Sequence, residues 1–330
     1  MRNIKFDTHC HIFDSDILNT GSRLLVKLLH LDNLVNLLDY TKIDKNFVEK
    51  IKDIAEFLDI CSKDSKDIFL DIQTRYPEKL ALVPLMADFT FAAAKNDTHE
   101  NDFFKKIESF VNKIFNHYHN SKGKQSIENQ NLIKELDTHW TKFSRSYNHY
   151  SNKKSRIPNV FSKNGFERQK KELEEIKSTP EYKDFIYPFL MLDPRHQRKN
   201  NFNIMEMVRA TFPNGKCNKF AGIKLYTPMG YSPTDPILFD KNGVYDFCQT
   251  HNIPITIHSS CGGFATLLNE VKVTGKIYDN KQDKVYDFDG TYKFKTTIIH
   301  HKLEAIEERG SVLNHPKIWK FVMEKYKNLK

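Results

Sequence analysis

The sequence has few cysteines, and none of them are spaced as a pair. The five cysteines are odd in number, lie far apart and include no C-x-x-C motif: Cys10, Cys61, Cys217, Cys248 and Cys261. This usage argues against a disulfide framework and against a cysteine zinc site, and it favours a reducing compartment. We therefore expect a cytoplasmic protein.

Long apolar runs and basic stripes are also missing. No stretch reaches the ~20 apolar residues that a membrane-spanning helix needs, and MRNIKFDTHCH at the N-terminus has no apolar signal-peptide core. The formal net charge is +9, but the lysines are scattered among Asp, Glu and Asn. Since no basic stripe interleaves with aromatic residues, we expect neither a membrane nor a nucleic-acid partner. The sequence gives no indication of oligomeric state.

Short apolar runs alternate with helical patterns along the chain. This alternation predicts βα units around a parallel sheet, and 330 residues can hold one large α/β barrel. Hydrophobic residues at 39% are enough for a substantial core. The predicted strands cover residues 4–13, 80–86, 185–192, 221–226 and 253–258.

Two intervals are too long to be simple loops. Residues 95–180 carry helical patterns and predict an inserted helical subdomain, whereas 270–311 predict a second insertion. In the second insertion, Asp289-Gly290 within YDFDGTYKF predicts a hairpin turn. The expected organisation is a barrel start with strands one and two (1–94), the helical insertion (95–180), strands three to five (181–269), the hairpin insertion (270–311) and a helix leading towards a sixth strand (312–330).

The first strand carries two histidines in the segment FDTHCHIFD. Successive side chains of a strand point to opposite faces, so Asp7, His9 and His11 share one face. Residues i and i+2 lie ~6.5 Å apart, which lets both imidazoles reach one metal ion at ~2.0–2.1 Å. The alternative is a pair of histidines facing solvent on an edge strand.

The fourth and fifth strands, AGIKLY and IPITIH, place polar residues where a central strand is normally apolar. If Ile223 and Leu225 face the helices, then Lys224 and His258 face inward. A buried lysine must find an anion, lose its proton or be modified chemically. The alternatives are a lysine that extends to solvent and a core histidine held by hydrogen bonds. Loops rich in glycine and proline follow both strands, as in barrel active sites.

The segments DTHCH, YPFLMLDPR, GIKLYTPMGYSP and IPITIHSSCGG resemble the amidohydrolase-related family. Its members are metal-dependent hydrolases and decarboxylases built on a distorted (β/α)8 TIM barrel. The resemblance implies that His9, His11 and His258 are metal ligands. It also places Lys224 where some relatives carry a carboxylated lysine that bridges two metals, whereas others bind a single ion without it.

Family members complete the site with an aspartate that ends the eighth strand, and often with a histidine that ends the sixth. TTIIHH at 296–301 is one candidate for the sixth strand and would make His300 a ligand. We count five βα units. The expectation is therefore an incomplete barrel, the N-terminal part of a longer protein, without the catalytic aspartate.

The resemblance implies a divalent metal, with Zn²⁺ preferred and Mn²⁺ or Fe²⁺ as alternatives because the ligands are imidazoles and oxygens. A metal-activated water would attack a small carbonyl or carboxylate substrate, which Tyr226 and Arg195 could orient. Both residues are equally compatible with ordinary surface loops.

Three other functions stay open. They are a decarboxylase of the same family, a TatD-type deoxyribonuclease and an inactive barrel fragment. The nuclease would need a carboxylate ligand on a middle strand, where this chain has Lys224.

Overall fold

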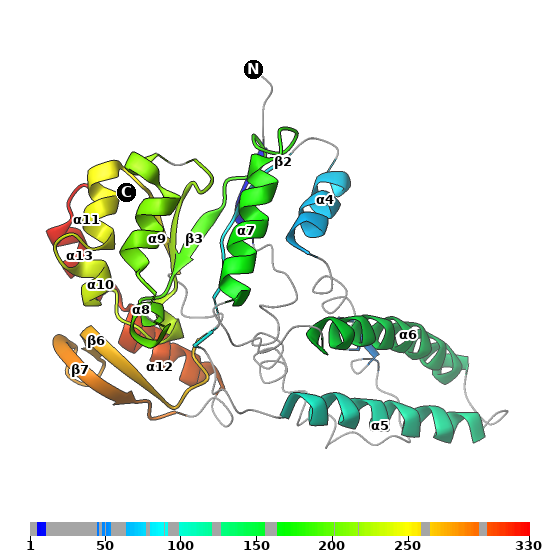
Figure 1. Cartoon of the computed structure of the whole chain (residues 1–330). Coiled ribbons are helices and arrows are strands. Elements are labelled where there is room, and N and C mark those ends of the chain that lie inside the picture. Colours follow the sequence, from blue (N-terminus) through cyan, green and yellow to red (C-terminus); the bar gives the residue numbers. More distant parts are fainter. Residues whose placement is uncertain are drawn as a thin grey trace. The chain divides into compact units, whose positions relative to one another are not determined.

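The computed structural model describes residues 5–10, 45, 48–49, 51–53, 64–76, 80–88, 90–91, 99–120, 127–155, 164–200, 202–216, 218–258, 265–296 and 302–330. The chain divides into two compact units (Figure 1). The first comprises Met1–Ile12, Phe69–Ala94 and Ser162–Lys330, and the second Phe13–Ile68 and Lys95–Phe161. Lys95–Phe161, within the helical insertion expected at 95–180, shares its unit with Phe13–Ile68, which precedes the second strand in the sequence.

All five predicted strands are present in the first unit. Their bounds are β1 (Lys5–Cys10), β2 (Leu80–Pro84), β3 (Phe189–Leu192), β4 (Gly222–Leu225) and β5 (Ile255–Ile257). β1 pairs with β2, and β3, β4 and β5 form a three-stranded sheet, all in parallel. Parallel bridges from Leu82 to Ile186 and from Leu85 to Phe189 join the two sheets. The spatial order of the strands therefore follows their order in the chain.

This sequential order has a topological consequence. Right-handed crossovers that always add the next strand on the same side place their helices on one face, as in a barrel. A doubly wound sheet would instead reverse its strand order at a switch point. The described residues contain no closed barrel. On the side of β5 away from β4, the Ile255 N–H donates to the Lys330 carbonyl at 2.8 Å.

Short helices follow the strands of the first unit, as the alternating pattern predicts (Figure 1). α9 begins at an Asn203 cap, whose side chain accepts the Glu206 N–H at 3.0 Å, and it buries Ile204 and Val208. Central strand β4 is buried at all four positions. The helices and 3₁₀ turns are α4 (Ser65–Arg75), α7 (Asn164–Ser178), α8 (Arg195–Asn200), α9 (Ile204–Thr211), η1 (Pro213–Gly215), η2 (Thr227–Met229), α10 (Pro236–Phe239), α11 (Val244–His251), α12 (Lys302–Asn314) and α13 (Pro316–Lys325).

The predicted hairpin is present, but its turn lies elsewhere. β6 (Glu270–Asp279) and β7 (Lys284–Lys293) pair in antiparallel register around a turn at 280–283. Asp289 lies inside β7 opposite Thr274, and its carboxylate accepts the threonine hydroxyl at 3.0 Å. The turn forms earlier because the Asp279 carboxylate accepts the Lys281 N–H at 2.7 Å and Asp283 adopts a positive φ of 51°.

The hairpin packs on α12 and on the loop after β4. Its inner face joins an apolar cluster of Val271, Val273, Ile277, Phe294, Val312 and Leu313. Gly275 has a φ of 119° and approaches the Thr234 backbone closely. A Cβ atom on this residue would lie only 2.8 Å from Thr234 backbone atoms. The Lys276 N–H donates to the Thr234 hydroxyl at 2.6 Å, and the Ser232 hydroxyl donates to the Lys276 carbonyl at 2.6 Å. The hairpin thereby covers the loop that follows β4.

Two neighbouring residues of α12 fix both ends of the hairpin. Arg309 is fully buried and donates to the carbonyls of Thr266 (2.7 Å), Leu268 (2.9 Å), Thr296 (3.2 Å) and Ala305 (2.9 Å). Glu308 accepts the backbone N–H groups of Lys295 and Thr296, both at 2.9 Å. Burial lowers the pKa of Arg309 to about 10. The guanidinium stays charged at neutral pH and satisfies four carbonyls.

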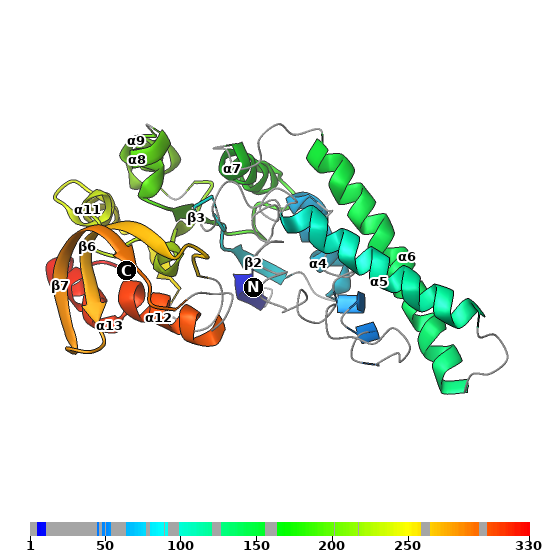
Figure 2. The same ribbon diagram turned by 90° about the horizontal axis from the view of Figure 1, so that it is seen from below.

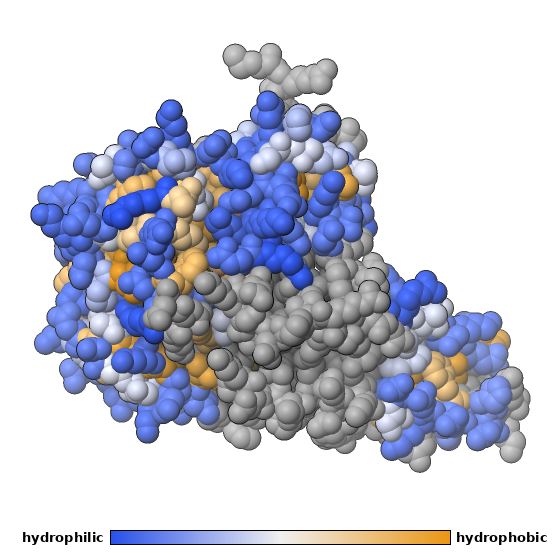
Figure 3. Space-filling model, viewed as in Figure 1, coloured by the Kyte–Doolittle hydropathy of each residue, from blue (hydrophilic) through white to orange (hydrophobic). Residues whose placement is uncertain are grey.

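The second unit contains two long helices, α5 (His99–Asn120) and α6 (Ile127–Ser155), which lie side by side in both views (Figures 1 and 2). α5 buries Phe110, Val111 and Ile114, and α6 buries Leu136. Hydrophilic residues cover most of the described surface in view (Figure 3). Among the described helices, none combines the length and apolarity needed to cross a membrane.

We predict that Arg309→Met lowers the free energy of unfolding by about 3 kcal/mol, because it leaves buried carbonyls without donors. Arg209→Met, on the exposed side of α9, is the matched control and should change stability by less than about 0.5 kcal/mol. Urea unfolding of both variants measures this difference. Equal stability of the two variants would show that the four carbonyl contacts do not hold the hairpin.

Candidate functional site

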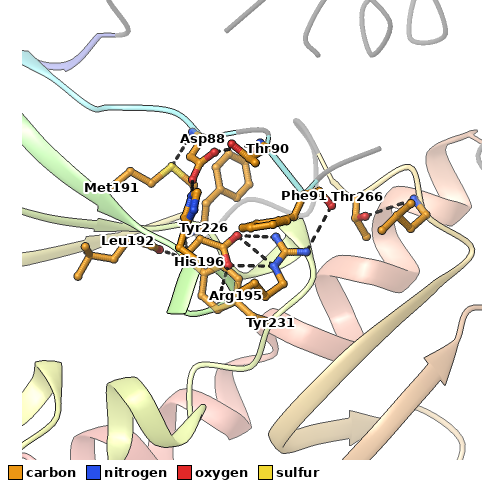
Figure 4. Close-up of polar contacts among 12 residues, drawn as sticks. Asp88, Thr90, Phe91, Met191, Leu192, Arg195, His196, Tyr226, Tyr231 and Thr266 are labelled. Carbon is orange, nitrogen blue, oxygen red and sulfur yellow. Dashed lines mark hydrogen bonds and ion pairs between the residues drawn. The ribbon is translucent and has the colours of Figure 1, made fainter. Parts of the chain in front are cut away.

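Polar side chains collect where the parallel strands of the first unit end. Asp88 follows β2, Asp193 and His196 follow β3, Tyr226 follows β4 and His258 follows β5. This edge, the C-terminal ends of the strands, is where parallel α/β folds bind their ligands. Figure 4 shows that the loops after β2 and β3 turn their side chains toward one another there.

Asp88 and His196 form a buried pair between the loops after β2 and β3 (Figure 4). His196 Nε2 lies 2.5 Å from Asp88 Oδ2, and the rings of Phe91, Phe166 and Phe202 surround the imidazole at centroid distances of 4.8, 5.5 and 6.1 Å. Burial alone would raise the pKa of Asp88 and lower that of His196. Their mutual hydrogen bond and charge reverse both effects, so the pKa of Asp88 is lowered and that of His196 is raised.

Asp193 and Arg195 form a second buried pair, within the loop after β3 (Figure 4). The Arg195 backbone N–H and Nε both donate to Asp193 Oδ1 at 2.9 Å, and Nη1 donates to the Phe91 carbonyl at 3.4 Å. The guanidinium lies over the rings of Phe91 (4.9 Å) and Tyr231 (5.8 Å). A Cβ at Gly230, which has a φ of 125°, would lie 2.7 Å from Arg195 Nη1. Arg195 was predicted to bind substrate, but its guanidinium pairs with the Asp193 carboxylate.

A third pair joins α8 to α10. Arg198 Nη2 lies 2.5 Å from both carboxylate oxygens of Asp235, which is buried and also caps α10 by accepting the Ile237 N–H at 3.1 Å. Burial raises the pKa of Asp235, and the charge of Arg198 offsets only part of this effect. Each of the three buried aspartates therefore has a basic partner.

Lys224 lies in the middle of the sheet and lacks such a partner. It occupies β4 between Met191 on β3 and Thr256 on β5, and only 1% of its surface is exposed. Among the described residues, its Nζ finds no hydrogen-bond acceptor, and the ring of Tyr226 lies 5.8 Å away. Burial lowers the pKa of Lys224 to about 8. The side chain does not extend to solvent.

Tyr226 and His258 stack on each other beside Lys224, with ring centroids 4.1 Å apart and an interplanar angle of 24°. The His258 N–H donates to the Leu225 carbonyl at 3.1 Å. Asn314, the last residue of α12, donates to the His258 carbonyl at 2.5 Å and accepts the Thr227 hydroxyl at 2.7 Å. Asn314 thereby ties the ends of β4 and β5 together.

The structure places the predicted site residues unevenly. It brings Lys224, Tyr226 and His258 together and puts Arg195 in the neighbouring cluster with Asp193. The backbone of His9 belongs to β1, but its side chain and all of His11 and His300 lie outside the described residues. In the described part of the chain, no three His, Cys, Asp or Glu side chains are grouped to hold a metal ion.

Sequence reasoning missed Asp88, His196 and Asn314. Asp88 directly follows the run LALVPLMA, so its place at a strand end was a usable signal, and His196 adjoins the quoted segment YPFLMLDPR. Asn314 gave no signal, because it lies on α12, 56 residues after the His258 carbonyl that it binds.

The chain matches no family model, no curated protein and no solved structure. The function proposed below depends on the sequence pattern and on the geometry of this strand edge.

We predict that the Asp88–His196 pair stabilises the fold most between about pH 4 and 6.5, the ordinary pKa values of the two groups. The raised pKa of His196 means that its contribution is complete below about 6.5 and is lost as pH rises through the folded value. The lowered pKa of Asp88 means that its contribution is complete above about 4 and is lost as pH falls through the folded value. His196→Gln should cost about 3 kcal/mol at pH 5.5.

The measurement is the free energy of unfolding of both proteins from pH 3 to 9. Asp240→Asn, an acidic residue after α10, is the control and should track the wild-type profile. A constant difference between His196→Gln and wild type over this range would contradict the prediction.

Proposed function

We propose that the protein is a metal-dependent hydrolase of the amidohydrolase-related family that acts on a small carbonyl or carboxylate substrate. The observation that supports it best is the gathering of Lys224, Tyr226 and His258 at the C-terminal ends of neighbouring parallel strands. The sequential strand order supports the further proposal that these strands are consecutive members of a (β/α)8 barrel.

The residues present are compatible with a metal site. His258 directly follows β5, and β1, which contains His9, belongs to the same series of strands through β2 and β3. The buried Nζ of Lys224, for which the described residues offer no acceptor, is compatible with a site that binds an anionic group. His9, His11 and His258 would hold the ion, with Zn²⁺ preferred over Mn²⁺ or Fe²⁺. Such an ion supplies an acidified water and polarises a carbonyl.

The other residues of the site would position these groups. Tyr226 stacks on His258 and restricts its ring orientation, and Asn314 holds the backbone carbonyl of His258. The phenol of Tyr226 would orient a substrate oxygen. The pairs Asp88–His196 and Asp193–Arg195 would fix the loops that border the site. Lys224 would act either as a carboxylated ligand or as a positive charge near the substrate.

A metal-dependent decarboxylase of the same family is the second candidate. It is favoured by the same Lys224, whose Nζ finds no acceptor in the part of the chain that the structure describes, because a buried ammonium attracts the carboxylate that such an enzyme removes. A TatD-type deoxyribonuclease is less favoured, since this chain has Lys224 on the strand where that enzyme would need a carboxylate ligand. We place either enzyme in the cytoplasm, with a small molecule as its substrate.

We predict that the full chain binds about one divalent ion and that His9→Ala, His11→Ala and His258→Ala each reduce metal occupancy sharply, because few ligands hold the ion. Elemental analysis after dialysis against Zn²⁺ or Mn²⁺ measures the stoichiometry. His139→Ala, on α6 beside Glu135, is the matched control and should leave it unchanged. Unchanged stoichiometry in all three site variants would refute the metal proposal.

A further inference from the structure

The buried charges of the first unit follow a pattern from which Lys224 departs. Asp88, Asp193 and Asp235 each have a basic partner at hydrogen-bond distance, namely His196, Arg195 and Arg198. The buried Arg309 has no such carboxylate in contact but donates to four backbone carbonyls instead. In the described part of the chain, Lys224 is the buried cation whose donors have neither kind of acceptor.

An isolated ammonium in a protein interior is costly, because it loses its hydration without gaining an acceptor. Within the described ranges nothing offsets this cost, since the neighbours of Lys224 in the sheet are Met191 and Thr256 and its Nζ has no acceptor. The carboxylates of Asp88, Asp193 and Asp235 already pair with His196, Arg195 and Arg198. A small anion bound from outside the chain would supply the negative charge that the described residues do not place beside Lys224.

We propose that Lys224 is the binding group for the carboxylate of a small anionic substrate. This inference rests on the proposed function for the reaction and narrows its substrate class from a carbonyl or carboxylate compound to a carboxylate. The stacked rings of Tyr226 and His258 border the same position and offer an aromatic surface to the body of such a molecule. Arg195 cannot take this role without leaving Asp193.

The buried ammonium of Lys224 favours a noncovalently bound anion at this position. An ammonium–carboxylate hydrogen bond is short and stronger than a neutral one, and it gains further strength where water is excluded. A divalent ion bound to His258 would add positive charge to the same region and increase the preference for an anion. Binding leaves both charges compensated and requires no change in covalent structure.

The experiment is a calorimetric titration of the full chain with acetate and benzoate, and with acetamide and benzamide as neutral counterparts of the same shape. Wild type should bind the carboxylates at least tenfold more tightly than the amides. Lys224→Met should abolish this discrimination, and Lys224→Arg should retain part of it. Lys219→Met, which removes an exposed lysine paired with Glu174 just before β4, is the control and should behave as wild type.

Stability supplies an independent readout. Lys224→Met removes an uncompensated charge and should melt at a higher temperature than wild type without ligand. Benzoate should raise the melting temperature of wild type but not of Lys224→Met, and benzamide should affect neither. If Lys224→Met fails to fold, the wild-type comparison of benzoate with benzamide still decides the question.

Several results would overturn the proposal. Equal binding of carboxylates and amides by wild type would do so, as would unchanged benzoate affinity in Lys224→Met. A bicarbonate-dependent gain of about 44 Da on Lys224, observed by mass spectrometry, would assign the residue to a carbamate instead. Each titration is run with and without chelator while metal content is measured. Selective carboxylate binding by a chain that holds no metal would refute the proposed function but support this inference. Metal binding without selectivity for carboxylates would refute this inference but support the proposed function.

Discussion

Complete burial of strand β4 constrains the chemistry of the first unit. All four of its residues are inaccessible, so each polar group that it carries must find its partner inside the protein or in a ligand. The backbone meets this requirement through the parallel ladders to β3 and β5. The side chain of Lys224 is the exception, since its Nζ has no hydrogen-bond partner among the residues that the structure describes.

Hydrogen bonds from surrounding elements fix the segments next to the C-terminal end of β4. Asn314 connects η2 to the end of β5, and Arg309 and Glu308 attach the two ends of the β6–β7 hairpin to the same helix. On the other side, the Asp88–His196 pair joins the loops after β2 and β3. The candidate site is thus framed by buried polar contacts between segments far apart in sequence. Such contacts favour the preorganised geometry that a binding or catalytic site requires.

The sequence predicted the parts of the fold that depend on local pattern. The five strands and α13 were expected from the pattern of apolar residues, and the burial of Lys224 from the alternation of residues in a strand. The hairpin lies in the segment where it was expected. Its turn does not lie at Asp289-Gly290, as predicted, because the Asp279 side chain stabilises an earlier turn. Local turn preferences differ by little, and register with β6 decides between them.

The rest could not be read from the sequence, because it depends on contacts between distant residues. Nothing in DPRH indicates that Arg195 would turn back on Asp193 or that His196 would meet Asp88, 108 residues earlier. The function class, the (β/α)8 barrel and the role of the H-x-H motif stay predictions. They are linked by one geometric claim, namely that the histidines of β1 and β5 converge on a single ion.

Crystals of the full chain grown with Zn²⁺ would test this claim most directly through anomalous diffraction at the zinc edge. We predict one strong anomalous peak at the C-terminal end of the strands, bonded to the imidazoles of His9, His11 and His258 with the Lys224 side chain close by. No zinc at that position, with the His9 and His11 side chains directed away from His258, would contradict it.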